Sequence, residues 1–301
     1  MIHGGAVAAS PPPANMTSRF ASPQPTRMPL RRSRSNAVPR VGRDRDDPRP
    51  PNALLLLLEG RAPLEFLSLF AALPWLARLP RGDGHPVMVF PGMAASDVTT
   101  LPLRRYLAGL GYVTRAWGQG LNFGPRPGVL ERCADDIRAL ADKHGEPVSL
   151  IGWSLGGIYA RELAKLHPSE TRCVITLGTP FTGHPKATNA WRLYEMLSRS
   201  KIGDAELMAE IRKPPAVPTT SIYSRSDGVV SWRCCLNDAG PLVENIEVPA
   251  SHVGMGANPA VLYAVADRLA QPIGPWRRFD VSGARRWFFR TALPDAMATA
   301  G

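Results

Sequence analysis

The sequence predicts an α/β domain in which a mostly parallel sheet carries helices on both faces. Between residues 81 and 273, short aliphatic and β-branched runs alternate with longer stretches whose apolar residues recur at helical spacing. Turns that contain glycine or proline separate these runs. Because alternating strands and helices produce parallel strands, reactive side chains are expected where the strands end, at their carboxyl edge.

The chain has 301 residues and a formal net charge of +11, most of which lies near its two ends. Residues 1–52 hold nine arginines and ten prolines but few large apolar residues, which predicts a disordered basic tail. Residues 274–301 are interpreted as a second basic tail. Nucleic-acid binding is not expected, because the charge does not lie on the folded part among interleaved aromatic residues.

Residues 53–80 are predicted to form an apolar helical segment packed on the domain. A membrane span needs about 20 apolar residues without charges. Here Glu59, Arg61 and Glu65 interrupt the run, and Pro74 follows them. The segment is therefore too short to span, while peripheral contact with a membrane surface stays an open alternative.

The four cysteines lack the spacing of metal ligands, and Cys234 and Cys235 are adjacent, which disfavours a disulfide between them. The first residues lack the positive start of a secretory signal. Reduced thiols in a cytoplasmic protein are the expectation, with membrane-peripheral attachment as the alternative.

The elements of the first half of the domain follow from these patterns. Residues 86–90 are a buried strand, and Pro91, Gly92 and Met93 begin the turn after it. After this turn, a helix is expected at 99–109, a strand at 112–117 and a helix at 129–144. A glycine-rich loop at residues 118–128 separates the strand from the second helix.

The second half continues the alternation with one interruption. Residues 181–213 break the rhythm with an apolar and aromatic composition, which predicts a small helical cap inserted between two strands. The regular elements are expected as strands at 148–151, 173–177, 219–223 and 245–248 and helices at 158–167 and 259–270.

One motif, Gly152-Trp153-Ser154-Leu155-Gly156-Gly157, stands between the strand at 148–151 and the helix that follows. It reads G-x-S-x-G, and a strand, a sharp turn and a helix are the context in which such a serine is exposed. Glycines on both sides of Ser154 fit a turn at which the backbones of strand and helix approach closely. Ser154 is therefore the candidate nucleophile.

Two further groups follow later strands, Asp227 after residues 219–223 and His252 after residues 245–248. A serine hydroxyl is a weak nucleophile at neutral pH, so an imidazole must accept its proton. His252 is the candidate base, and Asp227 is expected to orient the imidazole and stabilise its charged form. We expect the three side chains to meet at the carboxyl edge of the sheet.

Other residues compete for these roles. Asp204 and Asp238 are alternatives to Asp227, but neither directly follows a convincing strand. Among the other histidines, His184 is the real competitor because it begins the cap. The remaining ones stand in the tail, before the first strand or at helix ends, and they are His3, His85, His144 and His167.

An oxyanion formed during attack on a carbonyl needs preorganised N–H donors. The backbone N–H of Leu155 is one candidate, because it follows the nucleophile, and that of Met93 is the other. Trp153, Trp191 and Tyr194 are expected to line the substrate pocket, two of them from the cap.

The segments PVMVFPGM, GWSLGGIYAREL, ITLGTPFTG, SIYSRSDGVV and NIEVPASHVGMG together resemble the α/β-hydrolase superfamily, and within it a bacterial esterase/lipase-like family. The resemblance covers about residues 81–272. It implies a Ser–His–Asp mechanism with a covalent acyl-enzyme and without metal or cofactor. One departure is Pro91-Gly92, where many relatives carry His-Gly, which affects the identity of the second oxyanion donor.

The sequence thus predicts an α/β-hydrolase fold and a serine hydrolase that cleaves a carboxylic ester of an apolar acyl substrate, either a small molecule or a lipid. Acyl transfer or thioester hydrolysis would use the same three residues. A non-catalytic interaction protein of the same fold is a further alternative, which the intact Ser154, Asp227 and His252 disfavour. The oligomeric state cannot be inferred from the sequence.

Overall fold

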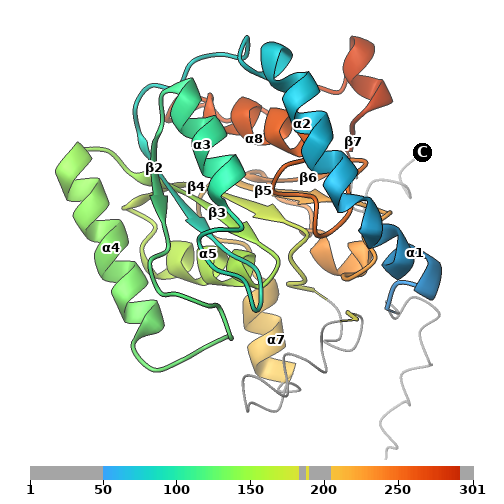
Figure 1. The fold of residues 1–301 in the computed structure, drawn as a ribbon. Coiled ribbons are helices and arrows are strands. Elements are labelled where there is room, and N and C mark those ends of the chain that lie inside the picture. The colour runs from blue at the N-terminus through green and yellow to red at the C-terminus, as the bar shows by residue number, and fades with distance from the viewer. Residues whose placement is uncertain (1–49, 183–187, 190–204, 292–301) are drawn as a thin grey trace, which may run out of the picture. The chain divides into compact units, whose positions relative to one another are not determined.

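A computed structural model describes residues 50–182, 188–189 and 205–291 of the chain (Figure 1). Their strands are β1 (Pro86–Phe90), β2 (Val113–Ala116), β3 (Val148–Trp153), β4 (Thr171–Leu177), β5 (Thr219–Tyr223), β6 (Val243–Glu247) and β7 (Arg290–Thr291). They form a seven-stranded sheet within the described residues, in the order β2-β1-β3-β4-β5-β6-β7. Strands β1 to β6 are parallel and β7 is antiparallel to β6, which confirms the predicted α/β class with a mostly parallel sheet.

Helices cover both faces of this sheet (Figure 1). They are α1 (Ala53–Leu58), α2 (Ala62–Leu76), α3 (Leu101–Leu110), α4 (Val129–His144), α5 (Leu155–Leu166), α7 (Ala205–Arg212) and α8 (Pro259–Leu269), with short 3₁₀ helices η1 (Glu59–Arg61), η3 (Trp232–Cys235) and η4 (Gly283–Trp287). Helices α2, α3 and α8 share one core with the sheet, and α4 and α5 share the other. The sheet is thus the middle layer of three.

Strand β1 shows how the sheet feeds both cores. Its five residues are fully buried, as expected for a parallel strand covered on both faces. Val87 and Val89 point into the core beneath α3 and α8, whereas Met88 and Phe90 point into the core beneath α4 and α5. This alternation is the period of two that a strand imposes on its side chains.

Local signals define the helix ends. Asn258 precedes α8, and its side-chain oxygen accepts from the backbone N–H of Ala260 at 2.9 Å, which caps the helix. Helix α3 ends at Gly111, whose φ of +105° lies in the left-handed region that glycine adopts without strain. Helix α4 coincides with the range expected from its apolar spacing.

The apolar segment before the domain forms α1, η1 and α2, and it packs on the sheet side that α8 covers. Leu69 and Leu76 of α2 are buried in the same core as α3 and α8. None of the described helices combines the length and the apolar character that crossing a membrane requires.

The end of the described chain differs from the sequence expectation. Residues 276–291 pack on the domain instead of beginning a free tail. Phe279 and Phe289 are buried against each other, with ring centroids 4.9 Å apart. The Phe279 N–H also donates to Glu244 Oε2 at 2.7 Å. These two aromatic residues hold the segment on the domain, although its composition is rich in arginine.

Much of the predicted cap falls on residues 183–187 and 190–204, which lie outside the described residues. Trp191, Tyr194, His184 and Asp204 are among them. Of the short helices expected at 181–213, the structure describes α7, which precedes β5 in the chain.

Candidate active site

The turn at Ser154 has the backbone geometry of a strained apex. Strand β3 ends at Trp153 and α5 begins at Leu155, so one residue joins them. Ser154 has φ of +52° and ψ of −122°, a conformation that non-glycine residues rarely adopt. Such strain persists only where surrounding structure enforces it, and it is common at functional sites.

Close backbone contacts explain the glycines beside this serine. A Cβ at Gly152 would lie 2.3 Å from the Cα of Gly157, and one at Gly156 would lie 2.4 Å from the carbonyl oxygen of Phe90. Neither distance is sterically allowed. The close approach of strand and helix expected at Gly152 and Gly156 is therefore what the structure shows.

His252 and Asp227 form a buried pair at the carboxyl ends of β6 and β5. Their Nδ1 and Oδ2 atoms are 2.6 Å apart, and the residues are 7% and 3% exposed. The other carboxylate oxygen, Oδ1, accepts from the backbone N–H groups of Val229 and Val230 at 2.8 and 2.7 Å. Asp227 is thus held in place by its own loop with one oxygen turned to the imidazole.

Several contacts bring this pair next to Ser154. The indole Nε1 of Trp153 donates to the carbonyl oxygen of His252 at 3.1 Å. A Cβ on Gly178, the residue after β4, would lie 3.0 Å from His252 Nδ1 and 3.1 Å from Asp227 Oδ2. The Ser154 N–H donates to Leu177, the residue before Gly178, at 2.8 Å. The ends of β3, β4, β5 and β6 therefore meet at one place.

Trp153 is accordingly a positioning residue for the histidine loop. Its ring also lies against Gly256, where a Cβ would approach it to 3.0 Å. Its expected contribution to the substrate pocket remains a prediction.

The charge state of His252 is set by opposing influences. Burial lowers the pKa of this imidazole, but the charge of Asp227, the hydrogen bond to it and the charge of Glu59 together raise the pKa above its ordinary value. An imidazole in this position accepts a proton readily and is stabilised once it carries it.

The expected oxyanion donors come from the turn after β1 and from the first residue of α5. Gly92 faces the serine, since a Cβ there would lie 3.4 Å from Ser154 Cβ, and Met93 follows it. Within the described residues, the N–H groups of Met93 and Leu155 have no backbone acceptor. Two such donors on one side of a reacting carbonyl are what an oxyanion requires.

Asn122, in the glycine-rich loop, holds the turn that contains Met93. Its side chain donates from Nδ2 to the carbonyl oxygen of Pro91 at 2.8 Å, and its backbone exchanges bonds with Ala94 and Ala95 at 2.7 and 2.9 Å. Asn122 is fully buried. The sequence showed only a loop rich in glycine here, and a lone asparagine in it carried no signal of this role.

A second positioning residue, Glu59 of η1, comes from the apolar segment before the domain. Its Oε1 accepts from the backbone N–H of Gly228 at 2.7 Å and of His252 at 2.9 Å, and its Oε2 accepts from Val253 at 2.9 Å. Glu59 is 9% exposed. One carboxylate thus joins the loop that carries Asp227 to the loop that carries His252.

Arg61 and Glu65 extend this connection. Arg61 donates from Nη2 to the hydroxyl of Ser226, next to Asp227, at 2.8 Å, and it pairs with Glu65 at 3.0 Å. Glu65 accepts from the backbone N–H of Ser251 at 2.8 Å. The three charges that interrupted the apolar run in the sequence therefore face the domain and hold the two loops.

A different Ser–His–Asp chain occurs at the opposite edge of the sheet. His85 Nδ1 contacts Asp83, and its Nε2 lies 2.8 Å from the hydroxyl of Ser149, near the start of β3. His85 and Ser149 are 1% and 0% exposed, so no substrate can reach the serine. Burial lowers the pKa of His85, which favours a neutral, structural imidazole.

The remaining alternatives do not converge on Ser154. Asp238 forms an exposed ion pair with Arg212 at 2.7 Å. His184 and Asp204 lie outside the described residues. Among the residues that the structure describes, no group of three His, Cys, Asp or Glu side chains could hold a metal ion.

The pH dependence of activity offers a test of the Glu59 contact. For His252 to accept a proton it must be neutral, so with the expected role of this residue kcat/KM should rise with pH through a pKa above 6.5, the ordinary value for histidine. Glu59→Gln removes a charge that raises this pKa, so the rise should move to lower pH. We also expect kcat/KM to fall about ten- to a hundredfold from misplaced loops.

Glu65→Gln is the matched control for this variant. It removes a carboxylate from the same helical segment that also accepts a backbone N–H of the histidine loop. Glu65 is not among the groups that raise the pKa of His252. An equal pH shift in both variants, or none in Glu59→Gln, would contradict a specific electrostatic effect of Glu59 on His252.

Comparison with known proteins agrees with this architecture. A family model described as "Alpha/beta hydrolase family" matches residues 96–297, more than half of the chain. The structure is similar to that of Aspergillus fumigatus lipase B, with a TM-score of 0.51 and 21% identity over 66% of this chain. That match spans only 55% of the lipase chain.

A second similar structure is the Bacillus licheniformis lipase BlEst2, with a TM-score of 0.48 and 15% identity over 64% of this chain and 95% of the lipase. None of the curated proteins matches the sequence significantly.

Proposed function

Because the chain belongs to the α/β-hydrolase family, we propose that it is a serine hydrolase that cleaves a carboxylic ester with an apolar acyl group. The observation that carries the proposal is the buried His252–Asp227 pair, 2.6 Å apart, beside the strained turn that presents Ser154. The turn acts as a nucleophile elbow, in which the hydroxyl stands clear of the sheet before the N-terminus of α5.

The proposed reaction proceeds in two halves. Ser154 Oγ attacks the ester carbonyl while His252 Nε2 takes its proton, and Asp227 stabilises the imidazolium. The N–H groups of Met93 and Leu155 stabilise the oxyanion. His252 then returns the proton to the departing alcohol, which leaves an acyl group on Ser154. A water molecule, deprotonated by His252, then attacks the acyl carbonyl, and the acid leaves as His252 returns the proton to Ser154 Oγ.

The preference for an apolar acyl group is supported by the side chains around these donors. Met93 is half-buried beside Ser154, and Val253 and Leu121, next to His252 and Asn122, are exposed. The sequence of the cap adds Trp191 and Tyr194, which we propose as walls of the acyl site. Acyl transfer and thioester hydrolysis differ only in the attacking or leaving group and would use the same residues.

An acyl-chain series tests the substrate class. Each methylene that the site buries contributes about 0.8 kcal/mol, so kcat/KM should rise about fourfold per methylene from acetyl upward until the site is full. Trp191→Ala or Tyr194→Ala should flatten this rise and leave acetyl-ester hydrolysis nearly unchanged. The measurement is kcat/KM for acetyl to decanoyl esters, with matched thioesters alongside.

The same series separates the outcomes. A uniform loss at all chain lengths in a folded variant would show that the residue does not contact the acyl chain. If kcat/KM were higher for every thioester than for the matching oxygen ester, the proposed substrate would be a thioester instead of an oxygen ester. The absence of any turnover, together with no labelling of Ser154 by a fluorophosphonate, would reject an enzyme altogether.

A further inference from the structure

The helical segment α1–η1–α2 has its polarity reversed relative to an ordinary surface helix. Its charged residues face the domain: Glu59 is 9% exposed, and the side chains of Arg61 and Glu65 are 25% and 11% exposed. Most of its large apolar residues face outward, with Leu57 at 76% and Trp75 at 78% exposure. The others exposed on this segment are Leu54, Leu56, Leu58, Leu64, Phe66, Leu67, Phe70 and Leu73.

A surface helix normally turns its apolar stripe toward the core and its charges toward water. In this segment Leu69 and Leu76 point inward, but other inward positions are taken by carboxylates that bind the backbone N–H groups of the two loops, among them those of Gly228 and His252. The apolar side chains are thereby left outside in a contiguous run. Contiguous apolar surface of this kind on a monomer marks an interaction site.

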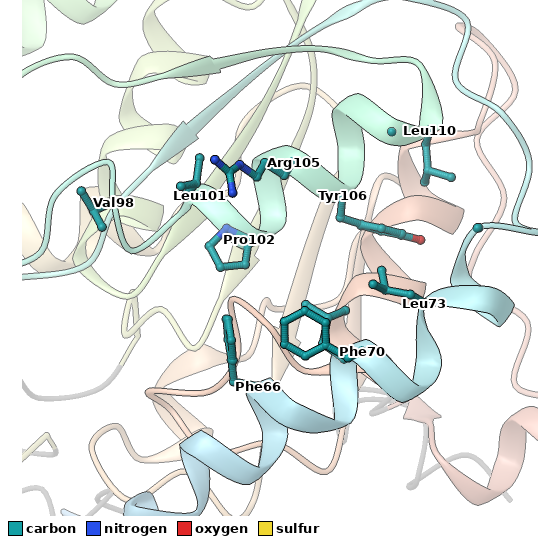
Figure 2. A pocket seen from close by; sticks show the side chains of 12 residues that line it. Phe66, Phe70, Leu73, Val98, Leu101, Pro102, Arg105, Tyr106 and Leu110 are labelled. Carbon is teal, nitrogen blue, oxygen red and sulfur yellow. The ribbon is translucent and has the colours of Figure 1, made fainter.

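An open groove continues this apolar surface between α2 and α3, with a volume of about 590 Å³. Figure 2 shows Phe66 and Phe70 of α2 pointing toward Pro102 of α3 across the groove. Nearly all the other side chains along it are apolar, and Arg105 is the charged group at its side. The groove is large enough for alkyl chains.

The exposed charges in residues 53–82 and on α3 are positive. The only carboxylates in residues 53–82 are Glu59 and Glu65, both turned inward, and α3 has none. Arg78, Arg81 and Arg105 are exposed and take part in no ion pair within the described ranges. Exposed arginines and a tryptophan beside an apolar face complement a layer of anionic headgroups above alkyl chains.

We propose that the outward face of α1 and α2, together with the α2–α3 groove, docks on a lipid bilayer that carries anionic headgroups. The helices would lie in the plane of the interface with their apolar side chains among the acyl chains. Glu59, Arg61 and Glu65 stay on the protein side, so docking leaves their bonds to the site loops intact. The proposal is independent of the reaction assigned to Ser154.

Flotation of the full-length protein with vesicles tests this docking. Phosphatidylcholine vesicles with and without phosphatidylglycerol are compared at low and high salt. The variant is Leu64→Ser combined with Leu67→Ser on α2. The matched control is Leu166→Ser, a leucine 60% exposed on α5, which packs on the opposite face of the sheet.

We expect the wild type and the Leu166→Ser control to float with both kinds of vesicle, more strongly with the anionic ones. The double variant should bind at least tenfold more weakly to both. Arg78→Gln combined with Arg105→Gln should reduce the preference for anionic vesicles and retain binding to phosphatidylcholine. Electrostatic attraction by the arginines of residues 1–52 is common to all variants and is screened by high salt.

Two results would overturn the proposal. One is flotation of the Leu64/Leu67 variant equal to that of the control, which would assign vesicle binding to another part of the chain. The other is no flotation of the wild type combined with a dimer that the Leu64/Leu67 variant breaks in size-exclusion chromatography. In that case the face would be a contact between two copies of the chain.

Discussion

Replacing Ser154 with alanine is expected to lower ester turnover about a millionfold, because the three proposed residues act as one unit. The variant removes the attacking oxygen and leaves the oxyanion donors in place. Alanine removes only the hydroxyl oxygen, so the turn keeps its packing. The measurement is kcat for a short-chain ester, with the melting temperature as the test of folding.

Ser149→Ala is the control, since it removes a serine hydroxyl that lies 2.8 Å from the Nε2 of His85. We expect this variant to keep its activity and to lose about 1–3 kcal/mol of stability, because it leaves the buried His85 without that partner. The assignment would be wrong if Ser154→Ala kept more than a tenth of the activity, or if Ser149→Ala abolished it in a folded protein.

Replacing Asp227 with asparagine is expected to reduce kcat about ten-thousandfold, the size of the effect in the well-studied case of this change. The asparagine oxygen can still accept from Val229 and Val230, so the loop should hold. Its amide group would then face His252 Nδ1 as a donor. This favours the tautomer that carries the proton on Nε2, which cannot accept one from Ser154.

Asp83→Asn makes the same change beside His85 and should leave kcat within a few-fold of the wild type. The comparison uses identical substitutions on two histidine-bound aspartates, so general effects of charge removal cancel. Equal losses in both variants would show that Asp227 has no special part in the reaction. Loss of activity in His252→Ala with retention in His184→Ala would complete the assignment of the base.

The parallel sheet and its helices could be predicted because the spacing of apolar residues within each element indicates which of its residues are buried. Helix α4 and strand β5 were predicted at their observed bounds, and the residues that follow β3, β5 and β6 were correctly placed at strand ends. Parallel strands bring their carboxyl ends together whatever the details of packing. The order Ser154, Asp227, His252 could therefore be read before any geometry was known.

The contacts that hold these residues could not be predicted in the same way. Glu59 interrupts an apolar run, and nothing near it in the sequence shows that its partners stand 169 to 194 positions away. Asn122 likewise acts through the turn after β1, which no local pattern links to its loop. The packing of Phe279 and Phe289 could not be predicted because the many arginines near them in the sequence indicate an exposed segment.

The contact between Glu59 and His252 also bears on when the proposed site can exist during synthesis. Ser154 leaves the ribosome as part of a complete strand–turn–helix, but His252 follows Trp153 by 99 positions. At about 5–20 residues per second, that interval lasts about 5–20 s. Glu59 lacks most of its hydrogen-bond partners during this interval, because two of the three N–H groups that it binds belong to His252 and Val253. A nascent chain would thus carry the proposed nucleophile without the proposed base until residue 252 has been synthesised.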